Sequence, residues 1–249
     1  MKFKKINSMR QLIGFSESYP SNSIHTIKLR NLLEMRDPLN ELKQIRTLFP
    51  PIEVGSITLV DQITLLALIE LVDPERILEI GTYQGYSTRL FLNNSNAQEI
   101  ISVDLPEFSN EKEVAVDKER VLQDGDYNDD YLRLIQNKSS GKYLNGLGES
   151  ERLRLKLIKC DSTKLDYKEE VGTIEFAFVD GGHHFDIVTQ DTCNVINQIK
   201  SGVIVWHDYS SAIHSDVTKF LAEHSKKNQV FYVLGSLCAF QIIGDCANV

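Results

Sequence analysis

The ten-residue run LEIGTYQGYS, from Leu78 to Ser87, constrains the fold of this chain more than any other stretch. It begins at the end of a predicted buried strand that carries an acidic residue, Glu79. Two glycines four positions apart, Gly81 and Gly85, then form a turn that leads into a predicted helix. Glycine allows a tight turn and a close approach of backbone to a ligand, so this loop is predicted to hold a cofactor.

From Ile77 onward, short β-branched runs alternate with stretches of helical period, which is typical of a parallel sheet wrapped by helices. Only Gly235 and Ser236 separate the last two strands, too few residues for a parallel crossover, so one strand is predicted to run antiparallel. The predicted fold is α/β, a doubly wound, seven-stranded, mostly parallel Rossmann-like sheet with one antiparallel strand near the C-terminus. The seven strands are predicted near residues 76–80, 99–104, 154–159, 174–179, 202–207, 229–234 and 237–243.

One domain is assigned to residues 51–249, and residues 1–50 to an N-terminal helical extension that acts as a cap or a dimerisation element. A helix is predicted over 57–72, and it ends before Pro74 because proline disfavours helical geometry in the residue before it. The segment of about 106–151 is longer than a crossover needs. It is predicted to be an insertion, either a lid or a solvated surface excursion. Further helices are predicted at 86–92, 185–199 and 215–224.

Composition narrows the classes of partner. A net charge of −8 and a pI near 5.3 argue against nucleic-acid binding, which usually needs a clustered basic face. The longest apolar run, 65–72, contains Glu70 and is too short to span a membrane. The four cysteines show no zinc-site spacing, and the first residues lack the apolar region of a signal peptide. We therefore expect a cytoplasmic protein with no nucleic-acid or membrane partner.

Acidic residues come at the ends of five predicted strands. They are Glu79, Asp104, Asp161, Asp180 and Asp208, the last preceded by His207. Ligands of doubly wound sheets bind at the carboxyl ends of the strands. One or two such acids would be unremarkable, because acids also cap helices and form turns. Five together predict a binding site along this edge.

The first loop does not fit a dinucleotide phosphate. Tyr83 stands where the fingerprint G-x-G-x-x-G has its middle glycine, and Glu79 would repel a phosphate. Asp104 is placed to accept hydrogen bonds from both hydroxyls of a ribose, and Asp161 with Ser162 to meet an adenine edge. A cofactor with a cationic end and no phosphate, a sulfonium nucleoside, meets all three demands.

Three motifs resemble those of a known enzyme family. The run 79–87 is similar to the first motif of the catechol-type O-methyltransferases, which has the same G-x-Y-x-G-Y-S form. The runs FVDGGH (178–183) and VIVWHDY (203–209) resemble a bacterial branch of that group, often linked to O-methylation of sugars or secondary metabolites. From about residue 55 to 243 the chain thus resembles a class I S-adenosylmethionine-dependent methyltransferase. It departs from its relatives at 200–202, where KSG replaces their usual Pro-Gly-Gly turn.

The resemblance implies S-adenosylmethionine as cofactor. Its methionine part would be contacted by Glu79, Gly81, Tyr83, Gly85 and Ser87. The resemblance also implies contacts from Asp104 to the ribose, and from Asp161 and Ser162 to the adenine. Asp180 is a further candidate, because its carboxylate can accept a hydrogen bond from the cofactor's amino group or brace the loop.

The resemblance also implies a metal and a base. Catechol-type enzymes bind a divalent ion through two carboxylates and an amide, and use a base three residues after the first aspartate. Carried over to this chain, Asp180, His207 and Asp208 would hold the metal, magnesium or manganese, and His183 would be the base. Imidazole is a poorer ligand for magnesium than for manganese, iron or zinc, so the need for a metal is left open. Of the neighbours His183 and His184, at most one is expected to face the substrate.

The predicted activity is methyl transfer to a hydroxyl of a small molecule such as a sugar or a phenolic metabolite. One alternative is a regulatory or assembly subunit that binds the cofactor without catalysis; a nicotinamide-dependent oxidoreductase is disfavoured by the loop. A homodimer is also left open. Three histidines, His25, His214 and His224, are expected at the surface or in the core, and Trp206 and Tyr209 in the pocket or in packing.

Overall fold

The computed structural model describes residues 24–36, 43–48, 54–107 and 116–244. The strands are β1 (Ile24–Lys28), β2 (Arg76–Ile80), β3 (Glu99–Asp104), β4 (Leu155–Lys159), β5 (Ile174–Val179), β6 (Ile199–Trp206), β7 (Val230–Leu234) and β8 (Ala239–Ile243). The helices are α2 (Leu29–Arg36), α3 (Leu59–Val72), α4 (Tyr86–Asn94), α5 (Lys118–Val121), α6 (Gly125–Ser139), α7 (Glu149–Leu153), α8 (Tyr167–Glu170), α9 (Phe185–Ile196) and α10 (Ser215–His224). Short 3-10 turns are η3 (Lys142–Leu144) and η4 (Ser162–Lys164).

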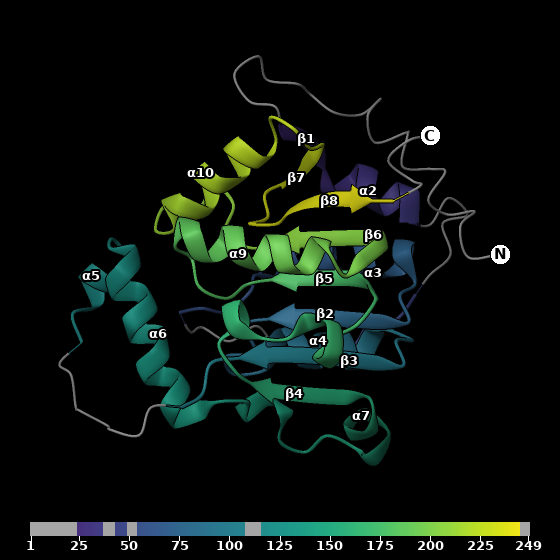
Figure 1. Cartoon of the computed structure of the whole chain (residues 1–249), viewed down its shortest axis with the longest axis horizontal. Coiled ribbons are helices and arrows are strands. Elements are labelled where there is room, and N and C mark those ends of the chain that lie inside the picture. Colours follow the sequence, from purple (N-terminus) through teal and green to yellow (C-terminus); the bar gives the residue numbers. More distant parts are fainter. Residues whose placement is uncertain (1–23, 37–42, 49–53, 108–115, 245–249) are drawn as a thin grey trace.

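The strands form one eight-stranded sheet in the order β1-β7-β8-β6-β5-β2-β3-β4 (Figure 1). Neighbouring strands pair in parallel, except for the two pairs that β8 makes with β6 and β7. The predicted class, a doubly wound and mostly parallel sheet with a reversed strand near the C-terminus, is confirmed. β2 and β5 are neighbours at the point where the strand order reverses, which is where such sheets bind ligands.

The sheet has one strand more than the sequence predicted. Residues from Thr26 onward carry a helical period, but Ile24–Lys28 is extended and pairs in parallel with β7, Ile24 lying opposite Val230. The partner strand is close to the other end of the chain, so no local period could show this pairing. Helix α2 follows at once and packs on α3, and most of the predicted 1–50 extension lies outside the described residues.

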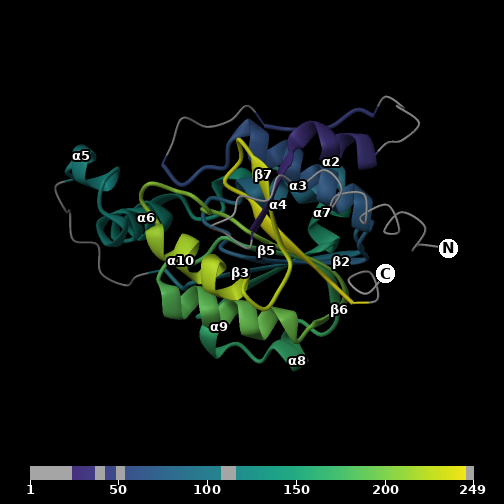
Figure 2. The same cartoon turned by 90° about the horizontal axis from the view of Figure 1, so that it is seen from above.

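Helices cover both faces of the sheet, as Figure 2 shows: α2, α3 and α4 lie on one face, and α8, α9 and α10 on the other. Side chains of β2 alternate between the two cores, Ile77 in the first and Leu78 and Ile80 in the second. Glu79 therefore points to the α4 face. Helix α9 ends at Ile196, three residues before the predicted end, because Ile199 already belongs to β6.

Helix α3 closely follows its prediction. Thr58 caps its N-terminus in a capping box with Asp61, and the chain leaves the helix at Asp73, in a left-handed conformation just before Pro74. Within the part of the chain that the structure describes, no helix has both the length and the apolar character that a membrane span needs. Cys160, Cys193 and Cys238 are free thiols, and only Cys238 is buried.

Candidate active site

A cavity of about 810 Å³ lies at the carboxyl ends of β2 through β6, a size typical of small-molecule sites. The structure brings most of the predicted site residues together in its walls: Gly81, Tyr83, Ser87, Asp104, Asp161, Ser162, Asp180, His183, His207 and Asp208. Glu79 and Gly85 do not line it. The α5–α6 segment stands beside this edge of the sheet (Figure 1).

The loop after β2 needs glycine at its first position. Gly81 has a φ of +99°, and a Cβ atom there would lie 1.9 Å from the backbone oxygen of Asp180. The reason is the close packing of three strand ends, those of β2, β3 and β5: the Asp180 N–H donates to the Ile80 oxygen at 2.8 Å, and the Gly81 N–H to the Val103 oxygen at 2.9 Å. Backbone therefore forms the floor of the cavity at the switch point.

Glu79 lies beneath this loop. It is fully buried on the α4 face, and its Oε2 accepts hydrogen bonds from the hydroxyls of Thr88 and Ser102. Burial raises the pKa of its carboxyl to about 7, although these hydrogen bonds act in the opposite direction. The structure thus places Glu79 as a brace under the loop rather than in the cavity wall.

The insertion forms part of the site. The N–H groups of Gly141 and Tyr143 donate to the backbone oxygens of Tyr83 and Gln84, each at 2.9 Å, and so hold the loop from outside. Helix α6 contributes cavity-lining residues, namely Asp126, Asn128, Asp129, Asp130, Leu132, Arg133 and Gln136. Of the two interpretations of the segment 106–151, a solvated excursion does not describe α6, which is a wall of the cavity.

Asp104 and Asp161 lie on the other side of β2 from the histidines, as the strand order requires. Asp104 accepts hydrogen bonds from Gln136 Nε2 at 2.5 Å and Lys159 Nζ at 3.2 Å, and burial raises the pKa of its carboxyl. Asp161 caps its own 3-10 turn, and its hydrogen bond with Lys164 lowers its pKa. These two acids mark the end of the cavity where the sequence predicts ribose and adenine.

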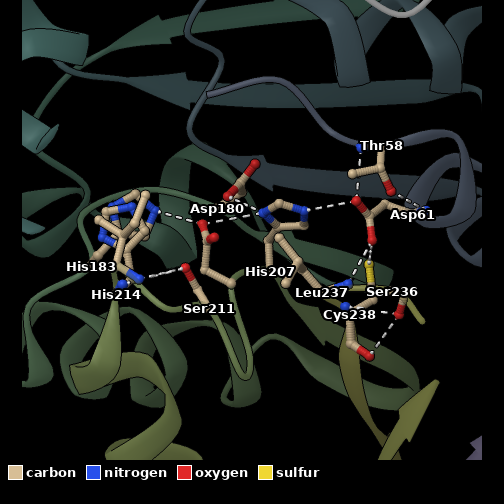
Figure 3. Close-up of polar contacts among 12 residues, drawn as sticks. Thr58, Asp61, Asp180, His183, His207, Ser211, His214, Ser236, Leu237 and Cys238 are labelled. Carbon is tan, nitrogen blue, oxygen red and sulfur yellow. Dashed lines mark hydrogen bonds and ion pairs between the residues drawn. The ribbon is translucent and has the colours of Figure 1, made fainter. Parts of the chain in front are cut away.

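At the opposite end, carboxylates and imidazoles alternate (Figure 3). His183 Nδ1 lies 2.7 Å from Asp129 Oδ1, and its Nε2 lies 3.0 Å from Asp208 Oδ2. His207 Nδ1 is 3.2 Å from both Asp180 Oδ1 and Asp208 Oδ2. Together with Asp61, which faces His207 Nε2 at 3.4 Å, these residues form what we call the histidine–aspartate cluster.

The cluster is strongly polarised. Burial alone would lower the pKa of His183, but contacts with Asp129 and Asp208 outweigh it and raise the pKa to about 10. Burial would lower the pKa of His207 too, but the charges of Asp180 and Asp208 outweigh burial and raise this pKa well above its usual value. The pKa of Asp208 falls well below its usual value, because the imidazoles outweigh burial. The surrounding carboxylates therefore favour the charged form of both imidazoles.

The sequence missed three residues of this end. Asp61 reads as a helix cap and Asp129 as one acid among many in the insertion, so only the fold brings them to the histidines. His214 is buried, as one of its two expected positions has it, but it also lines the cavity, and its ring stacks on His183 with centroids 3.7 Å apart. By contrast, Trp206 is a packing residue, fully buried with its Nε1–H donating to Thr192.

Tyr209 is also outside the cavity wall and packs on Tyr232. His184 is half-exposed, at 46%, and its ring faces Asp126 at 3.6 Å. Of the two adjacent histidines, His183 is held between Asp129 and Asp208, whereas His184 lines the cavity from a more exposed position with its Nε2 4.0 Å from Asp129 Oδ2. Donor atoms of Asp180, His183 and Asp208 lie within 4.8 Å of one another, so His183, the predicted base, lies as close to the two acids as a metal ligand could, beside the predicted ligand His207.

Comparison with known proteins places this geometry in a family. Residues 78–209, just over half of the chain, match the model of a family described as a methyltransferase domain. The chain belongs to this methyltransferase family. The match begins at the cofactor loop and ends one residue after Asp208, so it spans both ends of the cavity. The sequence-based prediction of a class I S-adenosylmethionine-dependent methyltransferase is confirmed.

Solved structures agree on the fold. The SAH-bound methyltransferase PaMTH1 from Podospora anserina has a TM-score of 0.52 and 16% identity, over 95% of this chain and 93% of its own. The O-methyltransferase NovP has a TM-score of 0.51 and 9% identity, over 74% of this methyltransferase and 78% of its own chain. No curated protein matches the sequence. At these identities the structures establish a common fold, and the acceptor has to be argued from the site itself.

Proposed function

We propose that this methyltransferase transfers the methyl group of S-adenosylmethionine to a hydroxyl oxygen of a small molecule, and that His183 receives the hydroxyl proton. The observation that carries the proposal is the place of His183 in the cavity wall, held between Asp129 and Asp208. A sugar or phenolic metabolite is the acceptor class that the motif resemblance favours.

Methyl transfer to a hydroxyl is an in-line displacement that also needs a base within hydrogen-bond reach of the proton. Asp129 Oδ1 lies 2.7 Å from His183 Nδ1, so it can accept the Nδ1–H and orient the ring. The other nitrogen, Nε2, then serves as the proton acceptor. A base whose second nitrogen is held by a carboxylate is a recurring arrangement in enzymes.

The charge state of His183 sets a condition on this role. With a pKa of about 10 the imidazole already carries its proton at neutral pH, and a base must be free to accept one. Asp208 is one of the two carboxylates that hold the proton. A cation bound by Asp208 would neutralise that carboxylate and bring the pKa of His183 down toward neutrality. The proposed base therefore depends on a cation at Asp208.

Asp180, His207 and Asp208 fit a divalent cation. His207 Nδ1 is 3.2 Å from an oxygen of each carboxylate. Neighbouring ligands of an octahedral ion with bonds of about 2.1 Å lie roughly 3.0 Å apart, which is close to this spacing. An imidazole beside two carboxylates favours manganese over magnesium. When bound, such an ion would lower the pKa of the acceptor hydroxyl and stabilise its oxyanion.

A methyl-transfer screen tests the proposal. The protein is mixed with methyl-labelled S-adenosylmethionine and a panel of hydroxylated metabolites, with and without EDTA, and label in the acceptor is counted. We expect transfer to a hydroxyl compound, loss of transfer with EDTA and recovery with added Mn²⁺. Transfer that EDTA leaves unchanged would exclude both the metal and the role of His183 as base, and would leave the methyltransferase activity itself in place.

The same screen separates catalysis from the regulatory alternative. Titration calorimetry measures cofactor binding independently of turnover. Saturable binding of S-adenosylmethionine with no transfer to any acceptor, in the presence of Mn²⁺, would favour a regulatory or assembly subunit. Homodimer formation and a cytoplasmic location stay predictions from the sequence, and light scattering of the purified protein measures the first.

A further inference from the structure

We propose that Asp61 is a positioning residue: it holds the Nε2 edge of the His207 ring so that Nδ1 faces Asp180 and Asp208. Its effect on catalysis rests on the proposed metal site, whereas its effect on the ring does not. Asp61 comes from α3, outside the residues that match the family model, and no motif of the sequence points to it.

Asp61 is a fully buried carboxylate with a fixed set of donors. Its Oδ2 accepts the Thr58 N–H at 2.8 Å, and its Oδ1 accepts the Leu237 N–H at 2.7 Å. The Cys238 thiol lies 3.8 Å from Oδ1. A buried carboxylate is tolerated only where hydrogen bonds or charges compensate it. Besides the two backbone N–H groups, the Asp61 carboxylate faces the His207 ring, with Oδ2 3.4 Å from Nε2.

The His207 ring is confined on all sides. Its backbone N–H donates to the Val179 oxygen at 3.1 Å, and Phe178 packs against the ring edge to face, with centroids 6.0 Å apart. Asp61 and Asp180 then lie at opposite edges of the ring (Figure 3). A carboxylate that accepts one imidazole N–H fixes the tautomer and leaves the other nitrogen free to ligate. In this ring that nitrogen is Nδ1.

Helix capping alone does not explain this arrangement. The cap accounts for the contact with Thr58, but Asp61 also binds the β7–β8 turn through Leu237, whose oxygen accepts the Tyr209 N–H at 3.0 Å. Tyr209 directly follows Asp208. One carboxylate thus ties the start of α3 and the β7–β8 turn to the segment that carries His207 and Asp208.

A metal held by Asp61, His207 and Cys238 is a competing interpretation, because donor atoms of the three lie within 4.8 Å of one another. Both oxygens of Asp61 already accept backbone N–H groups. The buried Cys238 thiol has a pKa well above its usual value, so it keeps its proton and is a poor ligand. A positioning role therefore accounts for these contacts better.

The test is Asp61→Asn in the full chain. Asparagine offers one acceptor oxygen in place of two, and the N–H groups of Thr58 and Leu237 compete for it, so Nε2 of His207 loses the carboxylate that faces it at 3.4 Å. Long-range ¹H–¹⁵N spectra report which ring nitrogens are protonated, with the His207 signals assigned by their absence in His207→Gln. Mn²⁺ binding is followed by electron paramagnetic resonance, and S-adenosylmethionine binding by calorimetry.

We expect Nε2 of His207 to be protonated in the wild type, both metal-free and with Mg²⁺, and the His207 ring signals to shift in Asp61→Asn because the ring loses the carboxylate that faces it. Mn²⁺ affinity should fall about 10- to 100-fold, and S-adenosylmethionine affinity should stay within about 3-fold. Thr58→Ala is the matched control: it removes the hydroxyl that caps α3 but keeps the Asp61 carboxylate, so His207 and Mn²⁺ affinity should not change.

A folded Asp61→Asn in which the His207 ring signals and the Mn²⁺ affinity stay as in the wild type overturns the inference. If the wild type binds no Mn²⁺ while Asp61→Asn still changes His207, the metal part of the proposed function fails and the positioning role stands. If Asp61→Asn does not fold, the wild-type spectrum decides, because an unprotonated Nε2 in the Mg²⁺-loaded protein contradicts the proposal.

Discussion

The two ends of the cavity are built in different ways. The end proposed to bind the cofactor consists of one continuous loop, 79–87, together with Asp104 at the end of β3 and Asp161 after β4, and its acids are engaged by neighbouring hydroxyls, amides or lysines. The end proposed to bind the acceptor is the histidine–aspartate cluster, whose members come from α3, α6 and the segments after β5 and β6. Its charges compensate one another across segments that are distant in the sequence.

This difference separates binding from reaction. The proposed cofactor end relies on the backbone shape of one loop and on acids that are each compensated by close neighbours. The acceptor end relies on shared protons between imidazoles and carboxylates, so its chemistry depends on which groups are charged. Changes at the first end should alter cofactor affinity and folding, and changes at the second should alter turnover.

The largest expected effect is at the acceptor end. His183→Asn removes the proposed base and keeps a polar side chain of similar reach, so kcat should fall about 10²- to 10⁴-fold. Cofactor affinity by calorimetry should change less than about 3-fold. His184→Asn is the matched control, because the His184 side chain is half-exposed. This substitution should lower kcat less than 3-fold. Equal losses in the two variants would contradict the assignment of the base.

At the cofactor end, Gly81→Ala forces a Cβ against the Asp180 oxygen in a left-handed conformation. We expect strain and the clash together to cost about 2 to 5 kcal/mol of the free energy of unfolding, measured by urea denaturation. Gly235→Ala is the control, since Gly235 has a φ of +88° and a Cβ there meets no atom within 4 Å. Gly235→Ala should lower the free energy of unfolding by only about 1 to 2 kcal/mol. An equal loss in the two variants would contradict the close approach of Gly81 to the Asp180 oxygen.

A pH test sharpens the comparison from within the cofactor end. The pKa of Glu79 is about 7 in the folded protein and 4.5 when unperturbed. Between these values the folded state keeps a proton that the unfolded state has lost, so the stability contributed by this group falls as pH rises from 4.5 to 7. Glu79→Gln has no titrating carboxyl at this position, so its stability lacks this dependence on pH.

The two proteins should therefore differ progressively with pH. Relative to Glu79→Gln, the wild type should lose about 3 kcal/mol of unfolding free energy between pH 4 and 8. Urea denaturation of both proteins in the same buffers cancels contributions from other titrating groups. A difference that stays flat over this range would mean that Glu79 is solvated or fully compensated.

Much of the fold was predictable because its signals are local. The alternation of β-branched and helical runs gave the strands β2 to β7 to within a few residues, and the two-residue Gly235-Ser236 connection correctly predicted the reversed β8. Strand β1 escaped prediction because its five residues are held by pairing with β7, a long-range interaction that leaves no local period.

The sequence by itself determined the cofactor loop and the acids at the strand ends, because strand direction and turn chemistry follow from neighbouring residues. Only the tertiary structure decided that Glu79 lies under the loop, that α6 forms a wall, and that Asp61, Asp129 and His214 join the histidines. Burial and shared protons are properties of groups brought together from distant segments, and no local pattern encodes which segments meet.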